Sequence, residues 1–176
     1  GIADWITQRG VRVDDVLLTH QHYDHVMDAA ALQALGCRLH AFADYSKDLT
    51  LESAARAWGM PISVTPYQVD GLFDMAKPLR IAGLEISLAH IPGHALDSVT
   101  FHLVDHGIVF SGDTLFAGSI GRTDFPKGNH QQLIDSITQK LWPLGSQTAF
   151  VPGHGPMSTF GHERKTNGYV SDYLLA

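Results

Sequence analysis

The spacing of apolar residues predicts alternating strands and helices in the first part of the chain. Apolar positions with helical spacing occur in three segments, each followed by a glycine: residues 2–9, 26–35 and 44–58. Short apolar runs predict two strands: residues 13–18 and 37–42. This order is typical of an α/β layer. Residues 61–76 show neither period, and we expect their apolar side chains to lie in the core: Leu72, Phe73 and Met75.

From residue 79 the apolar period shortens to two, which predicts antiparallel strands. The alternation indicates two hairpins, which span residues 79–88 and 99–110. Four further elements are expected: an irregular stretch over 114–128, a helix capped by Asn129, a strand over 147–151 and a helix in the tail from Asn167.

Size and composition are those of one globular domain. At 176 residues and 44% hydrophobic, the chain can bury a sizeable core, and we expect a single domain over residues 1–176. The formal net charge is −6, and the 12 Lys and Arg residues do not cluster. Binding to nucleic acid is therefore not expected. No stretch reaches the roughly 18 apolar residues of a membrane span, so membrane association is not expected either.

The single cysteine and the N-terminal sequence bear on the compartment. Cys37 alone excludes an internal disulfide and any zinc site built from cysteines. No basic and apolar signal segment opens the chain. Both features indicate a cytoplasmic protein. The chain begins at Gly1 without a methionine, inside an expected helix, which indicates that N-terminal sequence precedes it.

Histidines and a carboxylate gather directly after the first predicted strand. The sequence of residues 19–25 is Thr-His-Gln-His-Tyr-Asp-His. His20 and His22 are two apart, so in extended backbone both rings point to one side and can hold one metal ion. Asp24 and His25 follow as the chain turns, and can serve a second ion. A lone histidine here would be structural, but four ligand-type side chains in six residues indicate a metal site.

Three further candidate ligands follow predicted strands in glycine-containing loops: His94, Asp113 and His154. Taken singly, each would be structural more often than not. If their strands share a sheet, the loops open on one edge, and the ligand set becomes His20, His22, Asp24, His25, His94, Asp113 and His154. Seven ligands are too many for one catalytic zinc, which takes about three. The remaining histidines are isolated, and we expect structural roles for them: His40, His90, His102, His106, His130 and His162.

Two ions resolve the ligand count. One ion would be held by His20, His22 and His94, and the other by Asp24, His25 and His154. Asp113 would bridge them, together with a shared hydroxide, at an ion separation of about 3.5–4 Å.

Four motifs in this order resemble the metallo-β-lactamase superfamily: Thr19-His20-x-His22-x-Asp24-His25, Pro92-Gly93-His94, Gly112-Asp113-Thr114-Leu115-Phe116 and Pro152-Gly153-His154-Gly155. Residues 112–125 are similar to the glyoxalase II (hydroxyacylglutathione hydrolase) branch, and residues 152–164 resemble its short bacterial members without the C-terminal helical domain. The resemblance implies a four-layer αββα sandwich with a dinuclear site at one edge. Such proteins begin with a strand pair before the helix at residue 2, so we expect an N-terminally truncated fragment.

The resemblance also implies the reaction. A metal-bridging hydroxide would attack a thioester carbonyl, S-lactoylglutathione being the type case, with Asp24 orienting the hydroxide and zinc, iron or manganese as the metal. No Gly-x-Ser-x-Gly elbow, P-loop or Gly-x-Gly-x-x-Gly offers a rival chemistry. Arg122 is the candidate contact for a substrate carboxylate, the alternative being an ion pair with Asp124. Pro156 replaces a tyrosine of the longer enzymes, so glutathione specificity is open. Asp113 stands where class B1 β-lactamases have a cysteine, which argues against antibiotic hydrolysis.

Three alternatives stay open at this point. Gly121-Arg122-Thr123-Asp124-Phe125 also resembles the persulfide dioxygenases of the superfamily, in which residues corresponding to His20, His94 and Asp113 bind one iron. A metal-holding module or inactive fragment is the second alternative. An endonuclease of the same fold is the third, although the acidic chain lacks a basic arm. The sequence specifies neither the natural substrate nor the oligomeric state.

Overall fold

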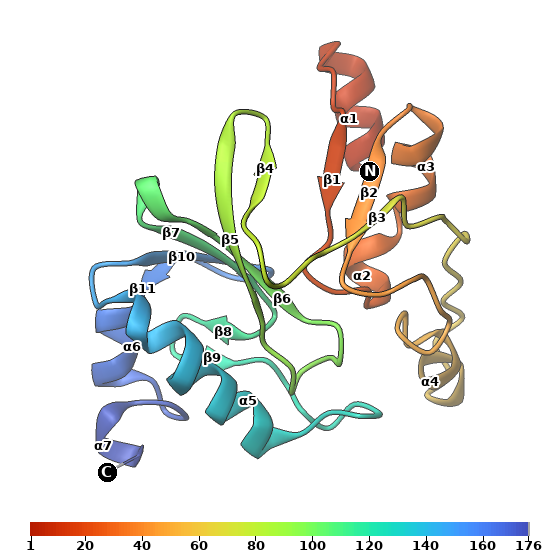
Figure 1. Cartoon of the computed structure of the whole chain (residues 1–176). Helices are drawn as coiled ribbons and strands as arrows, with labels where there is room; N and C mark the ends of the chain where they lie inside the picture. Colours follow the sequence, from red (N-terminus) through yellow and green to blue (C-terminus); the bar gives the residue numbers. More distant parts are fainter. Residues whose placement is uncertain (176) are drawn as a thin grey trace. The chain divides into compact units, whose positions relative to one another are not determined.

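The computed structural model describes residues 1–175. The chain forms two units, divided between Phe73 and Asp74. The first unit contains a three-stranded sheet, and the second contains a six-stranded sheet and a two-stranded hairpin (Figure 1). The single domain expected over residues 1–176 stays a prediction.

The sheet of the first unit is parallel, with the order β1-β2-β3. Its strands are β1 (Asp15–Leu17), β2 (Arg38–Ala41) and β3 (Gly71–Leu72). Four helices accompany it: α1 (Ile2–Arg9), α2 (Tyr23–Val26), α3 (Ala29–Ala34) and α4 (Glu52–Ala57). In the register of β1 and β2, Asp15 lies opposite Arg38 and Leu17 opposite His40. Leu18, Val26 and Leu39 belong to one buried apolar cluster of this unit.

Two helices of this unit differ from the predicted ones. The helix expected over 26–35 is shortened to α3, and α2 precedes it; between them the Asp28 carboxylate accepts a hydrogen bond from the backbone of Ile2. The helix expected over 44–58 begins only at Glu52. Before it, the Thr50 hydroxyl donates to the Lys47 carbonyl oxygen at 3.1 Å. Such local bonds stabilise a turn at the expense of a helix.

The core position expected for Leu72 is wrong. Its side chain is 58% exposed, and Phe73 and Met75 are half-buried. Leu72 lies on β3, which pairs only with β2 among the described strands, so one edge of this short strand is open. An apolar residue in an unassigned stretch therefore carried no information about the face on which it lies.

The sheet of the second unit has the order β11-β10-β7-β6-β5-β4. Its strands are β4 (Leu79–Ile81), β5 (Leu84–His90), β6 (Val99–Leu103), β7 (Ile108–Gly112), β10 (Ala149–Pro152) and β11 (Ser158–Thr159). Both predicted hairpins are confirmed by the antiparallel pairs β4–β5 and β6–β7. Ala82 and Gly83 both have positive φ, as a two-residue type I′ turn requires. Among the described strands of this sheet, only β7 and β10 pair in parallel.

The stretch 114–128, expected to be irregular, contains a small hairpin of β8 (Leu115–Phe116) and β9 (Ser119–Ile120). The predicted cap at Asn129 is confirmed, because its side chain accepts from the Gln132 backbone N–H at 2.9 Å at the start of α5 (His130–Ser136). The chain ends in α6 (Phe160–Thr166), which was not predicted, and α7 (Asp172–Leu175) in the expected tail.

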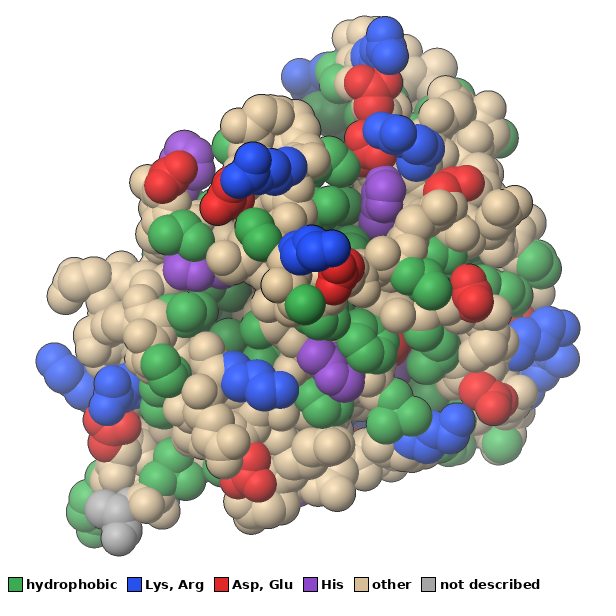
Figure 2. Space-filling view, viewed as in Figure 1, with side chains coloured by type: hydrophobic (Ala, Val, Ile, Leu, Met, Phe, Trp, Pro, Cys, Tyr) green, Lys and Arg blue, Asp and Glu red, His purple; other side chains and the backbone are tan. Residues whose placement is uncertain are grey.

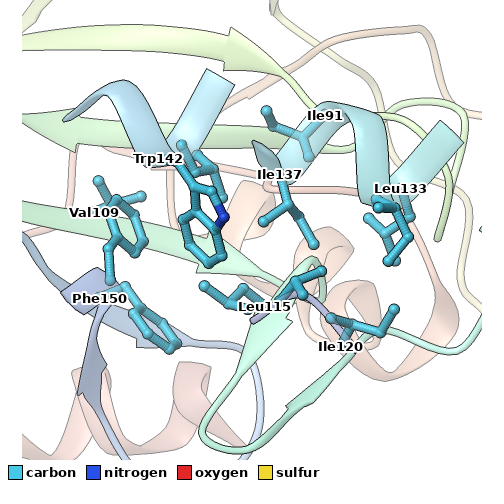
Figure 3. Packing of buried hydrophobic residues seen from close by; sticks show 12 residues of the cluster. Ile91, Val109, Leu115, Ile120, Leu133, Ile137, Trp142 and Phe150 are labelled. Atoms are coloured by element: carbon cyan, nitrogen blue, oxygen red, sulfur yellow. The ribbon is translucent and has the colours of Figure 1, made fainter. Parts of the chain in front are cut away.

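The core of the second unit lies between the strands and the helical segment 130–144, which begins with α5. Figure 3 shows Leu133 and Ile137 directed towards Leu115 and Ile120, and the ring of Trp142 beside Val109. These side chains are all at most 7% exposed. The apolar period of four along 133–141 is thus explained by packing onto the face of the sheet.

Charged side chains lie spread over the surface. In Figure 2 the Lys and Arg residues of the visible face are dispersed, and several have Asp or Glu beside them. Among residues 1–175, no helix is long and apolar enough to cross a membrane. The expectations that the chain binds no nucleic acid and is cytoplasmic stay predictions.

Candidate functional site

In the first unit, four candidate ligands follow the carboxyl end of β1. The imidazoles of His20 and His22 are 1% and 5% exposed, and their ring centroids are 4.6 Å apart. The ring of His25 lies 4.2 Å from that of His20. Nε2 of His25 is 3.7 Å from Oδ2 of Asp24. The structure therefore brings the four side chains of the first motif together, although Asp24 and His25 lie on α2 rather than in a loop.

A buried glutamine anchors this motif to the core of its unit. Gln21 is 0% exposed, and its side-chain amide donates to the carbonyl oxygen of Ala43 at 2.9 Å. Tyr67 donates its hydroxyl to the Gln21 side-chain oxygen at 2.7 Å. Since successive side chains of extended backbone alternate in direction, Gln21 enters the core while His20 and His22 point the other way. Sequence reasoning missed Gln21, although its place between two candidate ligands was a usable signal.

In the second unit, three candidate ligands follow strands of one sheet. His94 comes after β5, Asp113 after β7 and His154 after β10. These strands run in the same direction, because β5 and β7 both pair antiparallel with β6 and β10 pairs parallel with β7. Their carboxyl ends therefore meet at one edge, as the sequence led us to expect for these three loops.

Asp113 lies between the two histidines. Its Oδ2 is 3.7 Å from Nε2 of His94 and 3.4 Å from Nε2 of His154. His94 and Asp113 are 3% and 7% exposed, whereas the His154 side chain is 57% exposed. One carboxylate oxygen thus faces two imidazole nitrogens at distances longer than a hydrogen bond. This spacing leaves room for metal ions between the carboxylate and the two imidazoles.

The orientation of His94 is set by a backbone carbonyl. Its Nδ1 lies 2.8 Å from the carbonyl oxygen of Arg122. Because a carbonyl oxygen only accepts, Nδ1 donates its proton to it, and Nε2, which lies on the side of Asp113, is the nitrogen that could bind a metal ion. A histidine held in this way is the usual arrangement of a metal ligand.

Arg122 itself forms the ion pair that was the alternative to a substrate contact. Its Nε and Nη2 donate to the two carboxylate oxygens of Asp124 at 2.7 and 2.6 Å. The guanidinium lies over the ring of Phe125 at 4.3 Å. The hydrogen bond from Arg122 lowers the pKa of Asp124 below its ordinary value. Both charged groups remain well exposed, and binding of a substrate by Arg122 stays a prediction.

The histidines expected to be structural lie elsewhere. His40 is 2.8 Å from the carboxylate of Asp15, and Nε2 of His90 is 2.7 Å from the carbonyl oxygen of Leu96. His102 is half-buried in β6, and burial lowers its pKa. The other three are exposed: His106, His130 and His162.

The donor chemistry fits a divalent transition metal. Imidazole nitrogens and carboxylate oxygens are ligands that zinc and iron accept. Within each unit, ligand atoms of neighbouring candidates lie within 4.8 Å of one another: His20 with His22, Asp24 with His25, Asp113 with His154, and Asp113 with His94.

Comparisons with known proteins agree with this chemistry. The chain is 35% identical to the hydroxyacylglutathione hydrolase GloC of Haemophilus influenzae, over 97% of the chain and 84% of the relative. A crystal structure of the BLEG-1 B3 metallo-β-lactamase is similar at a TM-score of 0.83 and 32% identity, over 96% of this chain and 82% of that one. The structure of TTHA1623 in a di-iron-bound form is similar at a TM-score of 0.77 and 36% identity, over 96% and 83%.

These likenesses confirm the expected fold class. The model of the metallo-beta-lactamase superfamily matches residues 3–154, a range that contains the motif histidines and Asp113. The chain therefore belongs to the metallo-beta-lactamase superfamily.

Proposed function

We propose that the chain is a metal-dependent hydrolase that cleaves a thioester, with S-lactoylglutathione as the type substrate. The observation that carries the proposal is the Asp113 carboxylate between Nε2 of His94 and Nε2 of His154. Membership of the superfamily supports metal-dependent hydrolysis. The 35% identity to a hydroxyacylglutathione hydrolase supports the thioester.

Two divalent ions account for the full donor set. His20, His22 and His94 would hold one ion, Asp24, His25 and His154 would hold the other, and Asp113 would be shared between them. When bound, the ions supply a water of lowered pKa and a Lewis acid for the substrate carbonyl. Zinc suits these ligands, and the di-iron form of a similar protein supports iron as the alternative.

The roles of the protein groups follow from their positions. The Arg122 carbonyl oxygen keeps the proton of His94 on Nδ1, so that Nε2 serves as the ligand atom. Asp24, 39% exposed, is the carboxylate that accepts a hydrogen bond from the attacking water and orients it. A thiolate is a good leaving group, so the reaction requires no acid side chain for the departing sulfur. Arg122 is proposed to bind a carboxylate of the substrate in exchange for its ion pair with Asp124.

A β-lactam is the second candidate substrate. The similarity to a B3 metallo-β-lactamase over 96% of the chain favours it. Both substrate classes present an acyl carbon to the same kind of nucleophile, so the fold alone does not separate them.

Metal content together with substrate turnover tests the proposal. We expect about two zinc or iron ions per chain after purification without added metal, and hydrolysis of S-lactoylglutathione faster than that of nitrocefin. The Asp113→Asn variant is expected to lose about one ion and about 100-fold in kcat/KM, because it removes the charge shared by both ions. His162→Gln, at an exposed position away from these ligands, is the control.

Other outcomes would redirect the assignment. Turnover of nitrocefin alone would replace the thioester by a β-lactam. One iron per chain with oxygen uptake on glutathione persulfide, and no thioester hydrolysis, would replace the hydrolase by a dioxygenase. A wild-type chain without bound metal would overturn the proposal.

A further inference from the structure

The hairpin of β8 and β9 and the helix α6 belong to the second unit (Figure 1). Two buried polar side chains from α6 and the residue after it form hydrogen bonds with the hairpin. Glu163 and Asn167 are 0% and 1% exposed. The Glu163 carboxylate accepts from the backbone N–H of Gly118 at 2.7 Å and from the Asn167 side-chain amide at 2.9 Å. Ser158 donates its hydroxyl to the other oxygen of Glu163. The same Asn167 amide donates to the carbonyl oxygen of Ser119 at 3.0 Å.

Burying the Glu163 carboxylate in this way contributes little to the free energy of unfolding, because the desolvation of the charge opposes it. The three donors to Glu163 are all neutral groups, so no opposite charge offsets the desolvation of its carboxylate through these bonds. Apolar residues of similar volume at such a position often stabilise a protein as well or better. Hydrogen bonds are directional, so these bonds fix the position of the backbone at Gly118 and Ser119.

The backbone held in this way continues before β8 into the candidate ligand Asp113, and after β9 into Arg122, which orients the candidate ligand His94. Asp113 precedes β8, and Gly121 follows β9. The backbones of the two residues approach each other so closely that a Cβ on Gly121 would lie 1.8 Å from the Asp113 carbonyl oxygen. The next residue, Arg122, offers the carbonyl oxygen that orients His94.

The hairpin also reaches the third candidate ligand of this unit. The ring of Phe116 on β8 meets the imidazole of His154 edge to face, with centroids 6.3 Å apart. One small hairpin therefore adjoins all three candidate ligands of the second unit. Its tip is the part that α6 holds.

We infer that Glu163 and Asn167 are positioning residues for the metal ligands His94, Asp113 and His154. They act through the β8–β9 hairpin and touch none of the three ligands in the contacts described. The inference rests on the proposed function, because it assigns these two residues a role in binding the same ions. Outer residues that orient ligands are worth about tenfold to 100-fold in metal affinity.

Zinc affinity of the Glu163→Gln variant tests the inference. Glutamine keeps the size of the side chain but replaces one acceptor oxygen by a donor, which then faces the N–H groups of Gly118 or Asn167 or the hydroxyl of Ser158. We expect the dissociation constant of zinc, measured on the metal-free protein by competition with a chromophoric chelator, to rise about tenfold to 100-fold. The visible absorption of the cobalt(II)-loaded variant is expected to change, because it reports ligand geometry.

Glu52→Gln is the matched control. Glu52 is likewise buried at 2% exposed and accepts from the Val64 backbone N–H at 3.1 Å and the Thr50 hydroxyl at 3.0 Å. It belongs to the first unit, and the hydrogen bonds described for it are to residues of that unit. We expect it to lower thermal stability while zinc affinity and the cobalt spectrum stay as in the wild type. Glu163→Asp, which restores the carboxylate, is expected to recover part of the affinity.

The outcomes separate this inference from the proposed function. Wild-type zinc affinity and an unchanged cobalt spectrum in Glu163→Gln would overturn the inference alone, as would an equal loss of affinity in Glu52→Gln. Failure of the wild-type chain to bind zinc or iron would overturn both. If Glu163→Gln does not fold, Asn167→Ala decides, because it keeps the carboxylate and removes the bond to Ser119. Wild-type affinity in that variant would overturn the inference.

Discussion

Among single residues, the candidate ligands could be recognised from the sequence, but their supporting partners could not. His94 follows a Pro-Gly turn, which marks it as a loop residue with possible chemistry. Its partner is the backbone carbonyl of Arg122, 28 positions along the chain. Every residue type has such a carbonyl, so nothing in the sequence distinguishes this one. For the same reason, the orientation of a histidine is decided only when the chain has folded.

The ion pair of Arg122 and Asp124 predicts a competition with anionic substrates. If Arg122 binds a substrate carboxylate, Asp124 holds two of the N–H groups that this carboxylate needs. Exposed pairs of this kind are weak, so Asp124→Asn is expected to lower KM for S-lactoylglutathione by no more than about fivefold. KM for a thioester without a carboxylate should not change.

Steady-state kinetics on both thioesters check this expectation. Arg122→Gln is the paired variant and should raise KM for the anionic thioester only. A higher KM for both substrates in Asp124→Asn would show that Asp124 instead holds the loop in place.

Among secondary-structure elements, those with a regular period were predictable and those built on remote contacts were not. The hairpin of β4 and β5 is confirmed, because alternation and the Ala82-Gly83 turn are both local signals. The helix expected over 44–58 is shortened to α4, where the buried carboxylate of Glu52 accepts the N–H of Val64. The strand pair β8–β9 was missed because two residues per strand are too few to show a period.

Gly121, directly after β9, is a position at which an added side chain should disturb the packing of two segments. A Cβ there would lie 1.8 Å from the Asp113 carbonyl oxygen and 3.1 Å from Cβ of His94. We expect Gly121→Ala to destabilise the protein by about 1–3 kcal/mol, as overpacking usually does, and to weaken zinc binding by displacing Asp113. Urea unfolding of the metal-free protein and a zinc titration measure the two effects.

Gly168→Ala is the control for this substitution, since no atom lies within 4 Å of a Cβ at position 168. It should leave both stability and zinc affinity close to those of the wild type. Equal behaviour of the two variants would contradict the close approach between Gly121 and Asp113.

For the whole molecule, His102 predicts how stability depends on pH. Burial lowers the pKa of His102 below its ordinary value of 6.5, so the folded protein binds its proton less readily than the unfolded chain does. The folded protein therefore has its full stability with respect to His102 above pH 6.5, and it loses stability as the pH falls from 6.5 towards the lowered pKa of the folded state. The loss cannot exceed about 1.4 kcal/mol per pH unit for one proton.

Comparison with His102→Gln isolates this contribution, because the variant keeps every other titrating group. Urea unfolding of both metal-free proteins, followed by circular dichroism between pH 5 and 8, gives the difference in unfolding free energy. We expect the wild type to lose stability relative to the variant below pH 6.5. A difference that stays constant with pH would contradict the burial of His102 as the cause.

The sequence by itself determined the family, the strands of the six-stranded sheet other than β11, and the candidate ligands. Each depends on neighbouring residues: alternation marks a strand, and two histidines two apart on extended backbone share one side. Tertiary structure alone decided which strands far apart in the sequence pair and which side chains support the ligands. The parallel pairing of β7 with β10 brings Asp113 to His154, and α6 brings Glu163 to Gly118. Contacts between residues so far apart in the chain leave no periodic pattern, because they arise only when the segments pack.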